Sequence, residues 1–157
     1  MARTTELRLP AHRDYLVVAK RSAAAMGTVA GFDMDAVDDL TIAVSEAFEN
    51  AIACLERSGV DGGEVRLTFK EHPRGIDVNV RSTWSREAEM EARERARAAE
   101  AREHARRHVE LARQREAEQA AADLALRLMG LFVDDSSYRV DERTGALRVR
   151  LTKYRVS

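Results

Sequence analysis

The sequence of 157 residues lacks the features that mark secreted, membrane-spanning or nucleic-acid-binding chains. It has one cysteine, Cys54, which excludes an internal disulfide framework and indicates a reducing compartment. No run is apolar for long enough to cross a membrane, and the first residues lead into a polar segment rather than a signal-peptide core. The formal net charge is −1, so no overall positive field points to direct binding of nucleic acid. We therefore expect one cytoplasmic domain spanning residues 1–157.

Apolar residues recur with two different periods along the chain. Helical spacing predicts helices over about 14–26, 35–55 and 124–133, with Asp14 capping the first and Asp33 or Asp35 the second. Alternation of apolar and polar residues predicts strands over 7–9, 65–70, 76–80, 138–140 and 147–151, with a turn at 142–145. Together these elements predict an α+β fold, a two-layer sandwich of one mixed sheet under helices.

The most informative motif is the predicted helix over residues 39–52, which reads DLTIAVSEAFENAI. Its Glu46 and Asn50 are four residues apart and therefore point the same way. A carboxylate and a carboxamide placed like this suit a Mg²⁺ ion and a water or hydroxyl beside a nucleotide phosphate. On spacing alone, however, such a pair is usually a solvated helix edge.

With a strand and a helix before it and a hairpin after it, this helix resembles the N-box helix of the Bergerat-fold, or histidine-kinase-like, ATPases. Within that superfamily the stretch from Leu40 to Ile52 is most similar to the RsbW-type anti-sigma-factor serine kinases. The resemblance covers about residues 5–80 and 122–155. It implies that Glu46 is the general base, that Asn50 is a ligand of the Mg²⁺ in Mg-ATP, and that the chain forms a homodimer.

The sequence departs from this family where the nucleotide should bind. The resemblance places Ser82 where relatives have the aspartate that holds adenine, and Trp84 where they have the following glycine. Asp123 and Ala125 stand where relatives have two glycines whose backbone amides meet the phosphates. We therefore expect no functional cofactor. Mg-ATP remains an alternative if the alignment is misplaced, or if Ser82 or Asp77 supplies a substitute adenine contact.

The segment 85–122 replaces the nucleotide lid of the relatives. It consists almost entirely of Glu, Arg, Ala, Gln and His, and it contains neither Gly nor Pro. This composition favours helix, as do pairs such as Glu89 with Arg93 in the favourable order. We expect an inserted helix, continuous over about residues 85–132 and about 70 Å long. An arm on its own sheet, a dimer contact and a free charged rod all stay open. His104 and His108 have no carboxylate to complete a known metal motif, so no metal site is expected there.

Two functions follow from these observations. The first is a regulator that binds a protein partner, a sigma factor or an anti-sigma-factor antagonist, and so controls transcription without functional ATP binding. The resemblance implies that the first helix faces the partner, which makes Lys20 and Arg21 candidate contacts, although two ordinary surface cations fit equally well. The alternative is an ATP-dependent serine/threonine kinase that phosphorylates such an antagonist, with Glu46 as base. We prefer the regulator, and expect neither nucleic acid nor a membrane as partner.

Overall fold

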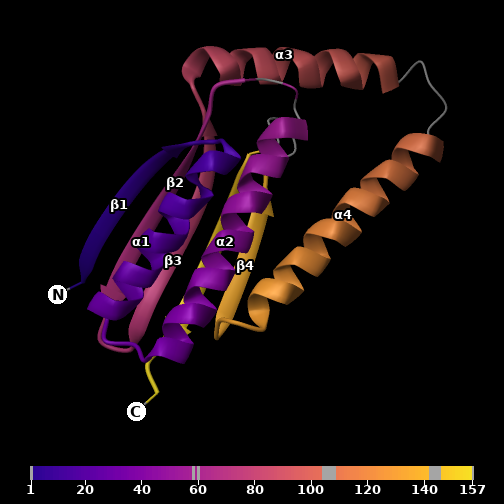
Figure 1. Cartoon of the computed structure of the whole chain (residues 1–157). Coiled ribbons are helices and arrows are strands. Elements are labelled where there is room, and N and C mark those ends of the chain that lie inside the picture. Colours follow the sequence, from indigo (N-terminus) through magenta and orange to yellow (C-terminus); the bar gives the residue numbers. More distant parts are fainter. Residues whose placement is uncertain (1, 58, 60, 104–108, 142–145, 157) are drawn as a thin grey trace.

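The described part of the chain is one five-stranded sheet with helices on one face (Figure 1). The computed structural model describes residues 2–57, 59, 61–103, 109–141 and 146–156. The elements in chain order are β1 (Arg3–Pro10), a 3-10 turn η1 (Arg13–Tyr15), α1 (Leu16–Val29), α2 (Met34–Arg57), β2 (Gly63–His72), β3 (Gly75–Trp84), α3 (Arg86–Glu103), α4 (Val109–Gly130), β4 (Asp135–Val140) and β5 (Leu147–Tyr154). The strands lie in the order β1-β2-β3-β5-β4.

The two-layer α+β sandwich predicted from the sequence is confirmed, but the sheet is not mixed. Every neighbouring pair of described strands is antiparallel. Short connections join β2 to β3 and β4 to β5, and such hairpins require antiparallel pairing. Between β1 and β2 the chain crosses the sheet twice, along α1 and back along α2, so β2 also runs against β1.

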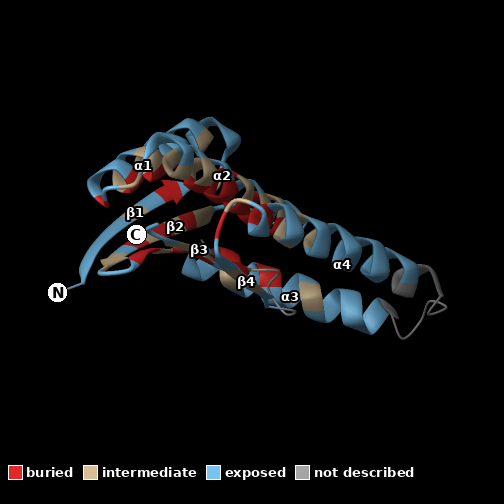
Figure 2. Ribbon diagram, turned by 90° about the horizontal axis from the view of Figure 1, so that it is seen from below, coloured by how far each residue is buried: buried red, intermediate tan, exposed pale blue. Residues whose placement is uncertain are grey.

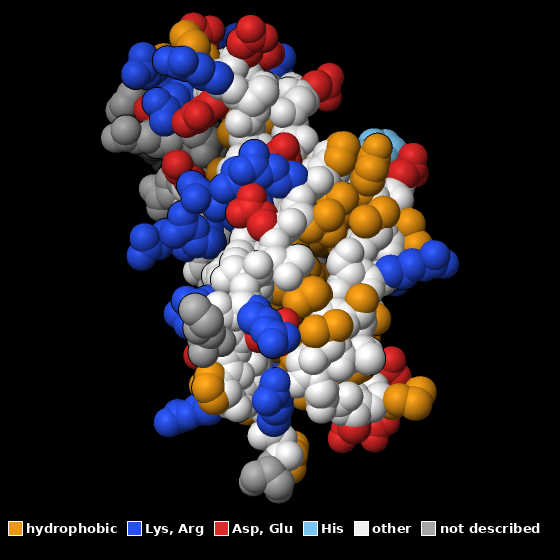
Figure 3. Space-filling model, turned by 90° about the vertical axis from the view of Figure 1, so that its left-hand side faces the viewer, with side chains coloured by type: hydrophobic (Ala, Val, Ile, Leu, Met, Phe, Trp, Pro, Cys, Tyr) orange, Lys and Arg blue, Asp and Glu red, His pale blue; other side chains and the backbone are white. Residues whose placement is uncertain are grey.

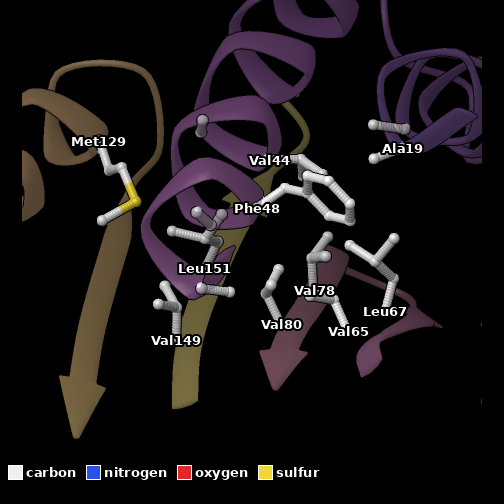
Figure 4. Close-up of a cluster of buried hydrophobic side chains, with 14 of the residues drawn as sticks. Ala19, Val44, Phe48, Val65, Leu67, Val78, Val80, Met129, Val149 and Leu151 are labelled. Atoms are coloured by element: carbon white, nitrogen blue, oxygen red, sulfur yellow. The ribbon is translucent and has the colours of Figure 1, made fainter. Parts of the chain in front are cut away.

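The core lies between the helices and the inner face of the sheet, where Figure 2 shows the buried residues. Phe48 of α2 points down onto Val65, Leu67 and Val78, which alternate with polar residues of the outer face (Figure 4). Phe48, Val65, Leu67 and Val78 are fully buried. Burying each such side chain contributes roughly 1.5–3 kcal/mol, so this layer accounts for much of the stability of the sandwich.

Small residues bring α1 close to α2. Ala19, Ala23 and Gly27, spaced one turn apart, are all buried. A methyl group added at Gly27 would lie 3.2 Å from Val37 Cγ2. A larger side chain at this position would therefore push the two helices apart. Leu16 and Met26 also pack against the core, whereas Val17, Val18 and Val29 of α1 are left exposed.

The sequence predicts the capping residue of α2 correctly and that of α1 incorrectly. Asp33 Oδ1 accepts a hydrogen bond of 2.8 Å from the backbone N–H of Ala36 and so caps α2, as one of the two expected aspartates. The cap expected from Asp14 is wrong. His12 Nδ1 instead accepts a hydrogen bond from the backbone N–H of Asp14, and η1 precedes α1. His12 therefore caps the 3-10 turn, and Tyr15, at the N-cap position of α1, makes no capping hydrogen bond through its side chain.

The single helix expected over 85–132 is wrong, because the structure forms two helices, α3 and α4, that run in different directions (Figure 1). The crossover from the end of β3 to the start of β4 has to span a sheet whose strands are about 33 Å long for ten residues. A straight helix of about 70 Å would overshoot this distance. The predicted turn at 142–145 and the histidines at 104 and 108 lie outside the described residues.

Both helices are anchored to the sandwich rather than free of it. Ala88 and Ala92 of α3 pack against Trp84, and the Arg95 guanidinium donates a hydrogen bond of 2.5 Å to the backbone carbonyl of Gly59. At the other end of the crossover, Met129 of α4 is buried in the core. Between these contacts the described residues, 93–102 and 113–121, are nearly all exposed, and the three alternatives left open by the sequence stay predictions. No described helix combines the length and the apolar character needed to span a membrane.

Candidate functional site

Glu46 and Asn50 lie on the side of α2 that faces β5 and α4. Asp39 precedes these two residues by seven and eleven positions, about two and three turns, and so lies on the same side of the helix. Its contacts therefore show what this side faces. Its Oδ2 lies 3.1 Å from Lys153 Nζ of β5, and the same ammonium donates a 2.9 Å hydrogen bond to the backbone carbonyl of Phe132, just after α4. The helix positions the two motif residues as the sequence predicts.

The polar atoms of this pair are only partly engaged. Asn50 Nδ2 donates a hydrogen bond of 2.8 Å to the backbone carbonyl of Glu46, one turn earlier. Within the described residues, neither the Glu46 carboxylate nor Asn50 Oδ1 has a hydrogen bond or ion pair. Both side chains are partly exposed. Oxygen ligands for a hard cation are therefore available on α2, in the arrangement that the sequence indicates.

Ser82, by contrast, is tied into the sheet. It is 1% exposed, and its hydroxyl accepts a hydrogen bond of 2.6 Å from the backbone N–H of Leu147 and donates one of 3.3 Å to the carbonyl of that residue. The backbone pairing of β3 with β5 ends one step earlier, at Arg81 and Arg148. At the next pair, Ser82 and Leu147, hydrogen bonds from the serine side chain thus replace the backbone hydrogen bonds between β3 and β5.

Asp77, the other residue considered for a substitute adenine contact, lies on the outer face of the sheet. Its carboxylate accepts a 2.8 Å hydrogen bond from the Thr152 hydroxyl and one of 3.2 Å from Arg150. Partial burial opposes ionisation, but these two partners outweigh it and hold the pKa of Asp77 below its ordinary value. The carboxylate is therefore turned away from α2 and already paired.

Asp123 forms a polar cluster between α4 and β4 that the sequence did not reveal. Its Oδ1 accepts hydrogen bonds of 3.0 Å from both the Tyr138 hydroxyl and Gln119 Nε2, and Gln119 Nε2 lies 2.7 Å from the tyrosine oxygen. Partial burial and the contact with Asp123 raise the pKa of Tyr138. The phenol therefore remains a neutral donor, and Asp123 serves to join the helix to the strand. Ala125, the other residue expected at a family glycine, is half-buried two residues later.

A pocket of about 360 Å³ lies at the ends of β3, β4 and β5, next to α3. Its lining includes Ser82, Trp84 and Glu89, but neither Glu46 nor Asn50. The motif on α2 and this pocket are therefore separate features of the molecule. In the described part of the chain, no three His, Cys, Asp or Glu side chains gather as a metal-binding group.

Lys20 and Arg21 are both exposed on α1: Arg21 lies opposite the buried small residues of the helix, and Lys20 flanks them. Neither side chain has a hydrogen bond or ion pair with a described residue. Close to them lie three exposed apolar side chains, Tyr15 (38%), Val17 (49%) and Val18 (38%). Helical spacing places Tyr15 and Val18 on the apolar side of this helix, so the sequence did not indicate that they are exposed.

Comparison with known proteins agrees with this architecture. The family model of the histidine kinase-like ATPase domain matches residues 9–153. The chain is also similar to the serine-protein kinase RsbW of Listeria monocytogenes serotype 4a (strain HCC23), with 34% identity over 74 residues, 47% of this chain and 46% of the relative. The serine-protein kinase RsbW of Oceanobacillus iheyensis is 28% identical over 75 residues, 48% of this chain and 47% of the relative.

The chain thus spans about half the length of the curated relatives that it matches. Because the family model covers far more than half of the sequence, the chain belongs to the family of histidine kinase-like ATPase domains.

Proposed function

We propose that this protein is an anti-sigma-factor-type regulator, which binds a sigma factor or an anti-sigma-factor antagonist and controls transcription without functional ATP binding. The observation that carries the proposal is the surface of α1. Val17 and Val18 lie about one turn before Lys20 and Arg21, and all four are exposed. Figure 3 shows apolar side chains gathered on this side of the molecule. Clustered apolar groups beside unpaired cations favour a protein partner.

The polar contacts of Ser82 and Asp123 support the loss of nucleotide binding. The Ser82 hydroxyl is committed to Leu147, and the Asp123 carboxylate adds negative charge to the region where the family binds phosphates. A hydrogen bond to a charged group is worth roughly 1.5–3 kcal/mol, so the missing adenine contact alone would weaken binding about 10- to 100-fold. Repulsion by Asp123 and the methyl of Ala125 would add to this loss.

A second candidate function is a serine/threonine protein kinase that acts on an anti-sigma-factor antagonist. It is favoured by the unengaged Glu46 carboxylate and Asn50 Oδ1, which suit a general base and a Mg²⁺ ligand. If the kinase is active, phosphoryl transfer to the antagonist is lost in both Glu46→Ala and Asn50→Ala. In the regulator, the same variants bind the partner like the wild type.

The test of the regulator is recovery of the partner from extract of the native cell, followed by calorimetry with the purified pair. We expect the wild type to retain a sigma factor or an antagonist, and Lys20→Glu/Arg21→Glu to lose it. The control Arg97→Glu/Arg127→Glu makes the same change in charge at exposed positions of α3 and α4. Equal affinity of wild type, α1 variant and control would contradict the assignment of α1. Gel filtration of the same proteins tests the proposed homodimer.

A further inference from the structure

Five arginines, one from each strand, stand opposite one another across the whole sheet. The register pairs Arg8 with Arg66, Arg66 with Arg81, Arg81 with Arg148, and Arg148 with Arg139. Successive side chains of a strand point to opposite faces, and the neighbours of these arginines on β2, β3 and β5 are buried. The five arginines, here called the arginine row, therefore share the outer face, away from the helices. Figure 3 shows basic side chains gathered on the sheet side of the molecule.

The arginine row is poorly neutralised by the rest of the described chain. Glu6 alone forms ion pairs with it, at 3.0 Å from Arg8 Nε and 3.6 Å from Arg66 Nε. Arg66 Nε is buried and has no hydrogen-bond partner. The guanidinium groups of Arg81, Arg139 and Arg148 have no hydrogen bond or ion pair with any described residue. Like charges directly opposite on neighbouring strands destabilise a sheet, so this arrangement lowers the protein's own stability.

One end of the arginine row is hollowed. Arg81, Arg139 and Arg148 all line the pocket of about 360 Å³, together with Trp84 and the buried Leu147. The three guanidinium groups therefore border a concave site, whose lining also includes the carboxylates of Glu89 and Asp141. Glu6, held between Arg8 and Arg66 at the other end, shows that the row accepts a carboxylate.

We propose that the arginine row is a docking surface for an acidic segment of a partner protein. Guanidinium groups match carboxylates in charge and in their paired donor geometry, so glutamate or aspartate side chains would supply the missing partners. Four steps between strands of about 4.8 Å give the row a length of about 19 Å, and six extended residues cover about 20 Å. The surface lies on the face opposite α1, so it is independent of the function proposed above.

Other occupants fit this surface less well. A second copy placed face to face would bring two arginine rows together, with like charges opposed. A nucleic acid carries negative charge well beyond the length of the row, where it would meet Glu64, Asp77 and Asp135 of the same outer face, whereas a short acidic segment can stay along the row. Of the described residues lining the row and its pocket, Trp84 alone is aromatic, which leaves little for bases to stack on.

The test is fluorescence anisotropy of the full chain with labelled hexaglutamate at low salt, compared with hexaglutamine and with an oligothymidine of equal charge. We expect saturable binding of hexaglutamate, and affinity about tenfold lower for Arg81→Gln/Arg148→Gln, because two charge-assisted contacts are lost. The control Arg97→Gln/Arg127→Gln removes the same charge elsewhere, and we expect less than a twofold change.

Three results would overturn the proposal. These are tighter binding of oligothymidine than of hexaglutamate, equal binding of hexaglutamine, or equal losses in the row variant and its control. Thermal unfolding supplies a second readout without any ligand. Relief of the repulsion should raise the unfolding temperature of Arg81→Gln/Arg148→Gln above that of the control variant, and a lower temperature would show that the row is a structural feature instead.

Discussion

Replacement of Ser82 by alanine tests whether this side chain has a structural role or is free to bind a ligand, at the position where the resemblance expects an adenine-binding aspartate. The hydroxyl satisfies both the N–H and the carbonyl of Leu147, and both residues are buried, at 1% and 4% exposed. Alanine removes the partner of both backbone groups. One buried, unsatisfied polar group costs about 1–3 kcal/mol, so we expect the free energy of unfolding to fall by about 2 kcal/mol.

The assay is urea or thermal unfolding of Ser82→Ala beside Ser137→Ala. Ser137 is exposed on β4 and its hydroxyl has no hydrogen bond with a described residue, so its replacement should change stability by less than about 0.5 kcal/mol. For a chain of this size, a loss of 2 kcal/mol corresponds to a fall of about 4–8 °C in the unfolding temperature. Equal stability of the two variants would refute the reasoning, because the Ser82 hydroxyl would then be free to contact a ligand.

Two further predictions concern contacts that hold the layers together. Lys153→Ala leaves the Asp39 carboxylate and the Phe132 carbonyl without their shared donor, and we expect a loss of about 1–2 kcal/mol by chemical denaturation, while Lys70→Ala at an exposed position changes little. Equal effects would contradict the shared contact. The pKa of Asp77 is lower in the folded state than in the unfolded chain, so its ionised form contributes stability above about pH 4, and this is lost as the pH falls through the folded pKa. The stability difference between wild type and Asp77→Asn should therefore shrink between about pH 5 and pH 2. A difference that is constant over this range would contradict the assignment.

Local patterns were sufficient to predict most of the sandwich. Alternation such as Val65, Leu67 and Phe69 places strands correctly, because a sheet with one buried face requires this period. The motif on α2 was likewise readable, since helical spacing alone sets Glu46 and Asn50 on one side. The sequence could not decide whether Asp33 or Asp35 caps α2; the hydrogen bond from the backbone N–H of Ala36 identifies Asp33.

Features that depend on pairing between distant segments were not predicted. The crossover after β3 reads as one helix from its composition, but the distance between the strand ends requires the chain to fold back. The partnership of Asp123 with Tyr138 depends on how α4 meets β4, and local sequence carries no signal for it. The arginine row did leave a signal, because each of its arginines interrupts an apolar strand. Only the register shows that all five are aligned.

The central claim is that this chain works through protein contacts rather than through bound nucleotide. Calorimetric titration with ATP and ADP in millimolar Mg²⁺ tests it most directly, with Asn50→Ala as a control for binding through α2. The account predicts no saturable heat up to millimolar nucleotide for either protein. Saturable binding in the micromolar range that Asn50→Ala abolishes would contradict it, and would favour the kinase instead.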